Sequence, residues 1–122
     1  MNIARLYSDN AGESHFEALE IAMNLQNFAP PAAPLLASAA TAATRYVLIE
    51  LPVGWGGDEP HPTPGRHMLF CLSGSFRVTA SDGSMHAVRA GDGLLMTDTT
   101  GKGHTTHVTS DVPATAVMIR LD

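Results

Sequence analysis

From residue 45 to the C-terminus, short apolar segments alternate with turn-forming residues. The segments span 45–51, 67–72, 75–80, 85–88, 94–97, 104–109 and 114–121. Glycine or proline lies in most of the turns between them, and Asp82-Gly83 is a typical hairpin turn. Short strands at a spacing of about 8–12 residues are typical of a β-sandwich or a β-barrel. The sequence therefore predicts an all-β fold.

The composition fits one domain of this kind. The chain has 122 residues, a usual size for a single domain with its own core. Hydrophobic residues make up 44% of the chain and charged residues 16%, which excludes an intrinsically disordered chain. The 11 glycines and 8 prolines argue against a helical bundle.

Charge and cysteine content narrow the possible partners. The formal net charge is −5, and without a basic surplus nucleic acid is not an expected partner. Cys71 is the only cysteine, so no intramolecular disulfide forms, and we interpret it as a small apolar filler. No apolar run reaches the about 18–20 residues of a transmembrane helix, and residues 1–5 lack the apolar core of a signal peptide. We expect a cytoplasmic protein that does not bind membranes.

The first 44 residues follow a different pattern. Residues 3–7 predict a short strand, and 15–23 is compatible with a strand or a helix. We favour a strand there, because the proline-rich stretch that follows offers nothing for a lone helix to pack on. Residues 28–34 are predicted to be extended, since proline fixes φ and removes donors. The alanine-rich residues 35–44 are compatible with a linker, a helical turn or an arm lying across a neighbour. We therefore divide the single domain into N-terminal strands with a Pro/Ala-rich arm (1–44) and a barrel (45–122).

Three of the six histidines lie at predicted strand ends beside glycine-bearing loops: His61, His67 and His104. Strand alternation places His67 on the same face as Leu69, and places His104 and His107 on opposite faces. A barrel interior that collected the three imidazoles would form a metal site, because neutral imidazole supplies a nitrogen lone pair. Such a site suits Fe(II), Mn(II), Ni(II) or Zn(II). The alternative is three polar loop histidines that never meet, and the spacing leaves both open.

Two stretches of the sequence, 61–74 and 90–104, resemble the two motifs of the cupin superfamily. Leu72-Ser73-Gly74 matches the turn that ends the first motif. Gly91-Asp92 matches the start of the second motif, and Gly101 with His104 matches its glycine–histidine spacing. Residues 98–104 are similar to a group of short, single-domain bacterial cupins without an agreed activity. The resemblance as a whole covers about residues 45–121. It implies a double-stranded β-helix (jelly-roll) barrel with a metal inside, and a homodimer.

The motif positions can be carried over residue by residue. His61 takes the place of the first histidine of the first motif, and His104 that of the histidine of the second. Thr63 stands where a second histidine is expected, His67 stands in place of a glutamate, and Val108 stands where a terminal asparagine would be. The resemblance thus implies a divalent metal ion (Fe, Mn, Ni or Zn) held by His61, His67 and His104. A chain that keeps only two ligands could instead have lost its metal and kept the pocket.

Five further residues are candidates for chemistry or for substrate binding. Asp98 is a candidate general base, a group that orients a ligand, or the polar end of a strand. Tyr46 could donate a hydrogen bond to a ligand if it faces inward. Arg66 and Lys102 flank the predicted mouth and could hold an anionic substrate, or they are solvated loop charges. Trp55 could cover the pocket as a lid or plug the end of the barrel.

Two functions of different classes follow. The first is a metal-dependent enzyme acting on a small organic molecule. We rank dioxygenase chemistry above isomerase or lyase chemistry, because a three-imidazole site leaves Fe(II) with open positions. The second is a non-catalytic cupin that binds a small polar ligand, which the threonine at position 63 favours. Both predict a small-molecule partner.

Overall fold

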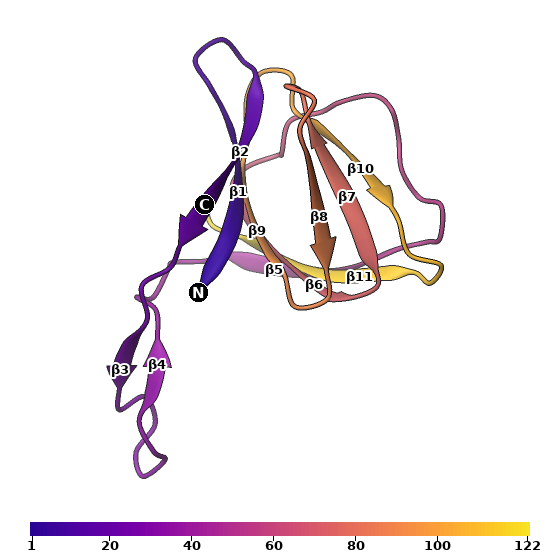
Figure 1. Cartoon of the computed structure of the whole chain (residues 1–122). Coiled ribbons are helices and arrows are strands. Elements are labelled where there is room, and N and C mark those ends of the chain that lie inside the picture. Colours follow the sequence, from indigo (N-terminus) through magenta and orange to yellow (C-terminus); the bar gives the residue numbers. More distant parts are fainter.

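The structure, a computed structural model, describes all 122 residues as β-strands joined by turns and loops (Figure 1). It confirms the all-β prediction, and none of its elements is a helix able to span a membrane. In chain order the strands are β1 (Asn2–Ser8), β2 (Ser14–Glu20), β3 (Asn24–Gln26), β4 (Leu35–Ala37), β5 (Arg45–Leu51), β6 (His67–Ser73), β7 (Ser75–Ala80), β8 (Met85–Arg89), β9 (Gly93–Thr97), β10 (His104–Val108) and β11 (Ala114–Arg120).

Two sheets face each other and form a jelly-roll barrel (Figure 1). The larger sheet has six strands in the order β2-β1-β9-β6-β11-β5, and the smaller has three in the order β10-β7-β8. Neighbouring strands are antiparallel except β1 and β9, which are parallel. The two strands that precede residue 45 in this large sheet, β1 and β2, form one of its edges.

Strand alternation determines which side chains form the core. In β7 every second residue is buried, so Phe76 and Val78 point at the larger sheet. Leu6, Leu69 and Leu94 meet them from three neighbouring strands of that sheet, β1, β6 and β9. This two-layer core fixes the position of the strand ends that carry the polar site.

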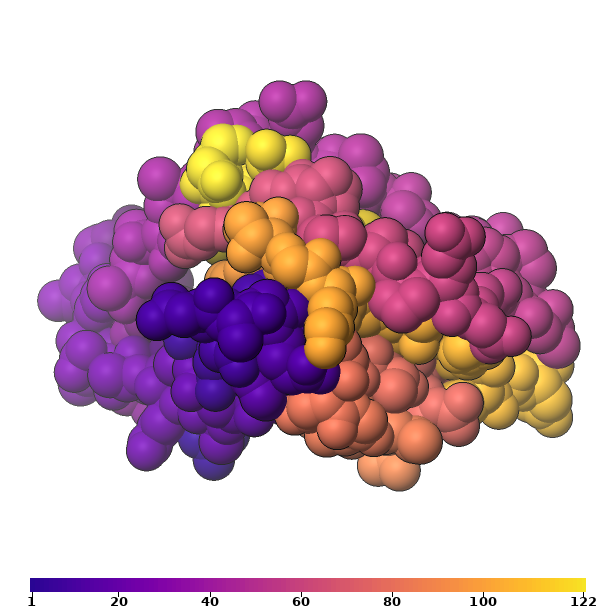
Figure 2. All heavy atoms as spheres, turned by 90° about the horizontal axis from the view of Figure 1, so that it is seen from above, coloured from indigo at the N-terminus to yellow at the C-terminus, as the bar shows by residue number.

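The proline-rich segment turns instead of being extended, which corrects the prediction for residues 28–34. The N–H of Ala32 donates to the carbonyl of Ala29 at 2.9 Å, so Pro30 and Pro31 lie in a turn that joins β3 to β4. The physical reason is that the fixed φ of proline suits turns as well as extended chain. We call residues 21–43 the arm. It projects from the body (Figure 1), and a small opening between part of it and the body is visible from above (Figure 2).

Candidate functional site

His61 and His104 lie directly opposite each other. His104 begins β10, and His61 belongs to the long loop between β5 and β6. Their backbones exchange two hydrogen bonds, of 3.1 and 3.0 Å, as the two residues of a hydrogen-bonded antiparallel pair do. Opposite residues of such a pair point to the same face, so the two imidazole rings meet with their centroids 4.9 Å apart.

Gly103 makes this close approach possible. Its φ is +76°, a left-handed conformation that L side chains rarely adopt. A Cβ atom at position 103 would lie 2.0 Å from the carbonyl carbon of His61. Any side chain there would push the backbone of His61 away from that of His104.

Thr63, Asp98 and His104 form a buried chain of hydrogen bonds. The Thr63 hydroxyl donates to Oδ1 of Asp98 at 2.7 Å, and Nδ1 of His104 lies 2.6 Å from Oδ2 of the same carboxylate. All three side chains are buried. Because a carboxylate only accepts, the hydrogen of this bond is on Nδ1 of His104, and Nε2 is the ring nitrogen that can present a lone pair. This Nε2 has no partner within the chain.

The chain of hydrogen bonds ends at a cavity inside the barrel. The cavity has a volume of about 130 Å³, and most of its lining is apolar. Such a volume holds a molecule about the size of benzene. Trp55 lies at the cavity and is partly exposed. The polar side chains of the lining are His61, Thr63, His104 and Thr106, beside the Trp55 indole.

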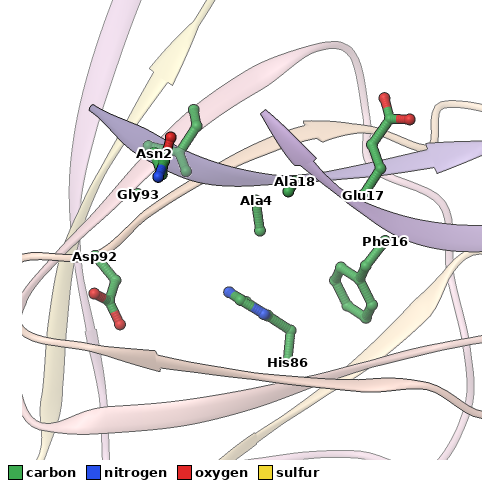
Figure 3. Close-up of a pocket in the computed structure, with 9 residues that line it drawn as sticks. Asn2, Ala4, Phe16, Glu17, Ala18, His86, Asp92 and Gly93 are labelled. Atoms are coloured by element: carbon green, nitrogen blue, oxygen red, sulfur yellow. The ribbon is translucent and has the colours of Figure 1, made fainter. Parts of the chain in front are cut away.

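A second hollow lies on the flank of the molecule, between β1–β2 and β8 (Figure 3). It has a volume of about 430 Å³, and small side chains such as Ala4 and Ala18 leave this space. The rings of His86 and Phe16 meet there, with their centroids 5.4 Å apart. Asp92 at its edge is exposed and accepts a backbone N–H. No buried polar side chain points into this hollow, so we assign the candidate site to the barrel cavity.

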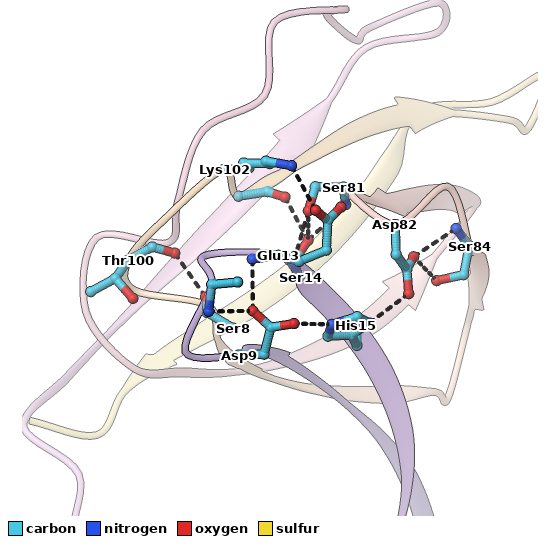
Figure 4. A network of polar contacts seen from close by, with 12 residues as sticks. Ser8, Asp9, Glu13, Ser14, His15, Ser81, Asp82, Ser84, Thr100 and Lys102 are labelled. Atoms are coloured by element: carbon cyan, nitrogen blue, oxygen red, sulfur yellow. Dashed lines mark hydrogen bonds and ion pairs between the residues drawn. The ribbon is translucent and has the colours of Figure 1, made fainter.

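The loop before His104 is held by the N-terminal turn (Figure 4). The backbone N–H of Lys102 donates to the carbonyl of Gly12 at 2.9 Å, and the Ser8 hydroxyl donates to the carbonyl of Thr100 at 2.8 Å. The buried Ser14 hydroxyl donates to the carbonyl of Gly103 at 2.7 Å. The N-terminal hairpin thereby holds Gly103, against which the backbone of His61 lies.

His15 joins two turns of this region. Its Nε2 lies 2.7 Å from Oδ2 of Asp9, and its Nδ1 lies 2.8 Å from Oδ2 of Asp82 (Figure 4). The hydrogen bond to Asp9, followed by that to Asp82, raises the pKa of His15 above its usual value. The same contact with His15 is the main cause of the lowered pKa of Asp9. For Asp82, hydrogen bonds from Ser84 are the main cause of the lowered pKa.

This arrangement predicts a pH-dependent stability. The pKa of His15 is raised by folding, so its contribution is full below the unfolded pKa of about 6.5 and is lost as pH rises through the folded pKa. The pKa values of Asp9 and Asp82 are lowered, so their contribution is lost as pH falls below about 4. We expect His15→Gln to lower the midpoint of thermal unfolding most between about pH 4.5 and 6.5.

Thermal unfolding followed by circular dichroism at pH 5.5 and at a pH well above the folded pKa of His15 checks this. The wild type and His15→Gln should converge at the higher pH. His86→Gln is the control, because His86 has no carboxylate partner. A difference between wild type and His15→Gln that grows with pH would contradict the prediction.

Comparison with known proteins identifies the family. Residues 47–120 match the sequence model of the family described as the cupin domain, which is more than half of the chain. The chain belongs to the cupin family. None of the curated proteins matches this cupin.

Two solved structures share the fold of this cupin. One is a sugar phosphate isomerase of the cupin superfamily from Silicibacter pomeroyi, with a TM-score of 0.50 and 20% identity, over 61% of this chain and 47% of that chain. This cupin thus spans about half of that isomerase. The other is the cupin domain of Cnp3 from Schizosaccharomyces pombe, with a TM-score of 0.50 and 11% identity, over 100% of this chain and 83% of that chain. At these identities the likeness shows the fold alone.

His67 does not join the histidine pair of this cupin. It begins β6, and its Nδ1 lies 2.9 Å from the carbonyl of Gly65, so the ring is held at the preceding turn. It is half-buried and is not part of the cavity lining, whereas Leu69, two residues further along the strand, is. Alternation gave the face on which His67 lies, but not its depth in the barrel.

The donor set therefore falls short of the three-histidine metal centre that the motifs imply. The structure contains no group of three or more His, Cys, Asp or Glu side chains that could hold a metal ion. His61 and His104 each use Nδ1 in a hydrogen bond and offer only Nε2, while both oxygens of Asp98 are engaged. A catalytic zinc site usually has three protein ligands. The residues present do not fit the implied ion, so we derive the chemistry of this cupin from its side chains.

The remaining candidates divide between the cavity and the surface. Trp55 lines the cavity, but the structure does not bring the other three to it. Tyr46 lies opposite Ile119 on the outer face of the large sheet and is exposed. Arg66 is exposed at that outer face too. The ammonium group of Lys102 pairs with Glu13 at 2.6 Å, which raises the pKa of the lysine.

Cys71 and Thr63, which the sequence analysis also names, are both buried. Burial raises the pKa of the Cys71 thiol, which favours the neutral thiol over a nucleophilic thiolate. Thr63, which stands at the motif position of a second histidine, donates a hydrogen bond to Asp98. The motif expects a side chain that points into the barrel at this position. The motif could therefore have indicated that Thr63 is an inward polar side chain.

Proposed function

We propose that this cupin binds a small, largely apolar organic molecule in its barrel and transfers a proton on that molecule through His104. The observation that supports this most is the buried chain from Thr63 through Asp98 to His104, which ends at the cavity. A carboxylate that fixes one nitrogen of an imidazole leaves the other nitrogen to act as a base, and later as an acid.

Size and charge define the ligand. The cavity of about 130 Å³ admits about six or seven non-hydrogen atoms. Its lining contains no lysine or arginine, so a phosphate ester is not the expected ligand. The Silicibacter pomeroyi protein is named a sugar phosphate isomerase, but a sugar phosphate would need a cationic group that this cavity lacks. We infer an aliphatic or aromatic compound with one carbonyl or hydroxyl group.

The proposed step is a proton transfer next to a carbonyl group. Nε2 of His104 takes a proton from the carbon beside the carbonyl, and the electron pair of the broken C–H bond moves into an enolate. The imidazolium that forms is paired with the Asp98 carboxylate, 2.6 Å from Nδ1. The proton then returns from His104 to the same carbon or to another atom, which gives exchange or isomerisation. His61, whose Nε2 is also free, lies beside His104 as a second proton acceptor.

Hydrogen exchange of cyclohexanone in D₂O tests this proposal. Cyclohexanone has the size and the carbonyl group that we infer, and proton NMR follows the loss of its α-hydrogen signals. Wild-type protein should accelerate the exchange over buffer, and His104→Gln should slow the protein-catalysed rate by about 100-fold, the lower range of a general base. His86→Gln, at the flank hollow, is the matched control and should exchange cyclohexanone like the wild type.

The other outcomes separate the competing functions. A wild-type rate equal to that of buffer, with cyclohexanone bound, would overturn the proton transfer and favour the non-catalytic cupin. Exchange that needs added Fe, Mn, Ni or Zn and is lost in His67→Gln would instead favour a metal-dependent enzyme.

A further inference from the structure

Strand β2 is an open edge of the large sheet. It pairs with β1 on one side and with no strand on the other. Proteins usually protect such an edge with a proline, a bulge, a very short strand or charged side chains. β2 is seven residues long, contains no proline and pairs with β1 without a shift in register. Its only protection is the exposed pair Glu17 and Glu20, since His15 is engaged at the turn by two carboxylates.

The register shows which backbone groups of β2 are free. Met1 and Ile21 exchange two backbone hydrogen bonds, of 2.7 and 3.2 Å, next to the end of this strand pair. In an antiparallel pair, such residues alternate with residues whose N–H and C=O groups point away from the partner strand. Phe16 and Ala18 are three and five positions before Ile21, so they belong to the second kind. Their N–H and C=O groups therefore point to the open edge.

The hollow on the flank leaves space for a further strand beside this edge (Figure 3). The N–H of Ser14 also points away from β1 and donates to the Ser81 hydroxyl at 2.7 Å, which closes the edge at one end. From Phe16 onward, β2 borders the hollow of about 430 Å³, and the Phe16 ring points into it. Across the hollow lies β8, the edge of the smaller sheet. An extended chain along β2 would place every second side chain in the hollow.

The charges beside the edge define the occupant. Glu17 and Glu20 are exposed on β2, and Asp92 is exposed at the rim of the hollow, whose lining contains no lysine or arginine. Glu17 pairs with Arg5 of β1 through Oε1 only, which leaves Oε2 free. Opposite charges on paired strands stabilise the pair, and like charges destabilise it. The edge thus repels another acidic strand, such as a second β2, and suits a basic one.

We propose that an extended segment of a partner protein, with alternating apolar and basic residues, adds to β2 as a further strand. Its backbone exchanges hydrogen bonds with Phe16 and Ala18, as in other cases of strand addition. Its apolar side chains fill the hollow beside the Phe16 ring, and a basic side chain on the other face lies opposite Glu17. The inference is independent of the proton transfer at His104, because the hollow and the barrel cavity share no lining residue.

A labelled peptide of alternating valine and lysine, as long as β2 and blocked at both ends, tests the proposal on the full chain. Fluorescence anisotropy at about 0.15 M salt, which screens long-range attraction, should show saturable binding to the wild type. A peptide with glutamate in place of lysine should bind about 10-fold more weakly or less still. Glu17→Lys, at an exposed position, should reverse this preference between the two peptides.

Ala18→Pro separates strand addition from attraction between charges. Proline removes the N–H that points to the open edge and breaks no hydrogen bond to β1, so the fold should be kept, which circular dichroism checks. The valine–lysine peptide should bind about 10-fold more weakly, the effect of losing one hydrogen bond. Ala18→Ser keeps the N–H and should bind this peptide like the wild type.

Ala87→Pro on the edge of β8 is the matched control. Ala87 is exposed, and its N–H points away from β7, because that of Arg89, two residues further, donates to Asp92. This variant should bind the valine–lysine peptide like the wild type. A wild type that does not bind this peptide at about 1 mM would overturn the proposal. So would equal binding of the two peptides, undiminished binding by a folded Ala18→Pro, or an equal loss in Ala87→Pro.

Discussion

Gly103→Ala is expected to lower the free energy of unfolding by about 2–5 kcal/mol, and to separate His61 from His104. The positive φ contributes about 1–2 kcal/mol, the usual cost of a left-handed conformation for an L residue. Displacing the backbone of His61, which a Cβ would approach to 2.0 Å, adds about 1–3 kcal/mol. The neighbouring atoms are backbone atoms, so no side-chain rotation can relieve the contact. Chemical denaturation measures the loss.

Gly83→Ala separates the two contributions. Gly83 also has a positive φ, of +89°, but a Cβ there would have no heavy atom within 4 Å. This variant should lose only the conformational part, about 1–2 kcal/mol. Equal losses for Gly83→Ala and Gly103→Ala would mean that the approach of His61 to position 103 is not as close as described.

Asp98→Ala and Asp98→Asn are expected to differ strongly in stability. Alanine leaves Nδ1–H of His104 and the hydroxyl of Thr63 buried without an acceptor, which should cost about 3–5 kcal/mol. Asparagine has nearly the same shape, can accept from His104 and can donate to Thr63. This variant replaces a charged acceptor by a neutral one, which should lower the free energy of unfolding by about 1 kcal/mol. Equilibrium denaturation in urea measures both values.

Asp111→Ala is the control for the removal of a carboxylate, because Asp111 is exposed and should change stability by no more than about 0.5 kcal/mol. Equal losses for the two Asp98 variants would show that the charge, and not the hydrogen bonds, stabilises the buried chain. A loss below about 1 kcal/mol for Asp98→Ala would contradict the burial of His104 against Asp98.

Most strands could be predicted because the two signals that define them are local. Alternating side chains mark the strands, and glycine-bearing turns mark their ends, so the structure reproduces 45–51 and 75–80 as β5 and β7. The proline turn at 29–32 could not be predicted, because proline suits extended chain and turns alike. For edge strand β5, the sequence did not determine which side chains point inward and which point outward. Both of its faces are apolar, so alternation could not tell that Tyr46 points outward and Ile49 toward the cavity.

The candidate site was predictable where the motifs specify it. His61 and His104 occupy motif positions and meet, and Asp98 orients a ring, one of the roles expected for it. Strand alternation gives the face on which His67 lies but not its position along the barrel axis. It could therefore not indicate that His67 lies outside the cavity lining. Pairings such as His15 with Asp82 join residues 67 positions apart, and no local pattern encodes them.

The ring-nitrogen NMR spectrum of His104, recorded while cyclohexanol is added, tests the central claim most directly. We expect hydrogen on Nδ1 and a lone pair on Nε2, whose signal shifts as the hydroxyl of cyclohexanol donates to it. The Asp98→Asn variant should weaken the preference for this tautomer. Hydrogen on Nε2 in the wild type, or a spectrum of His104 that saturating cyclohexanol leaves unchanged, would contradict the account.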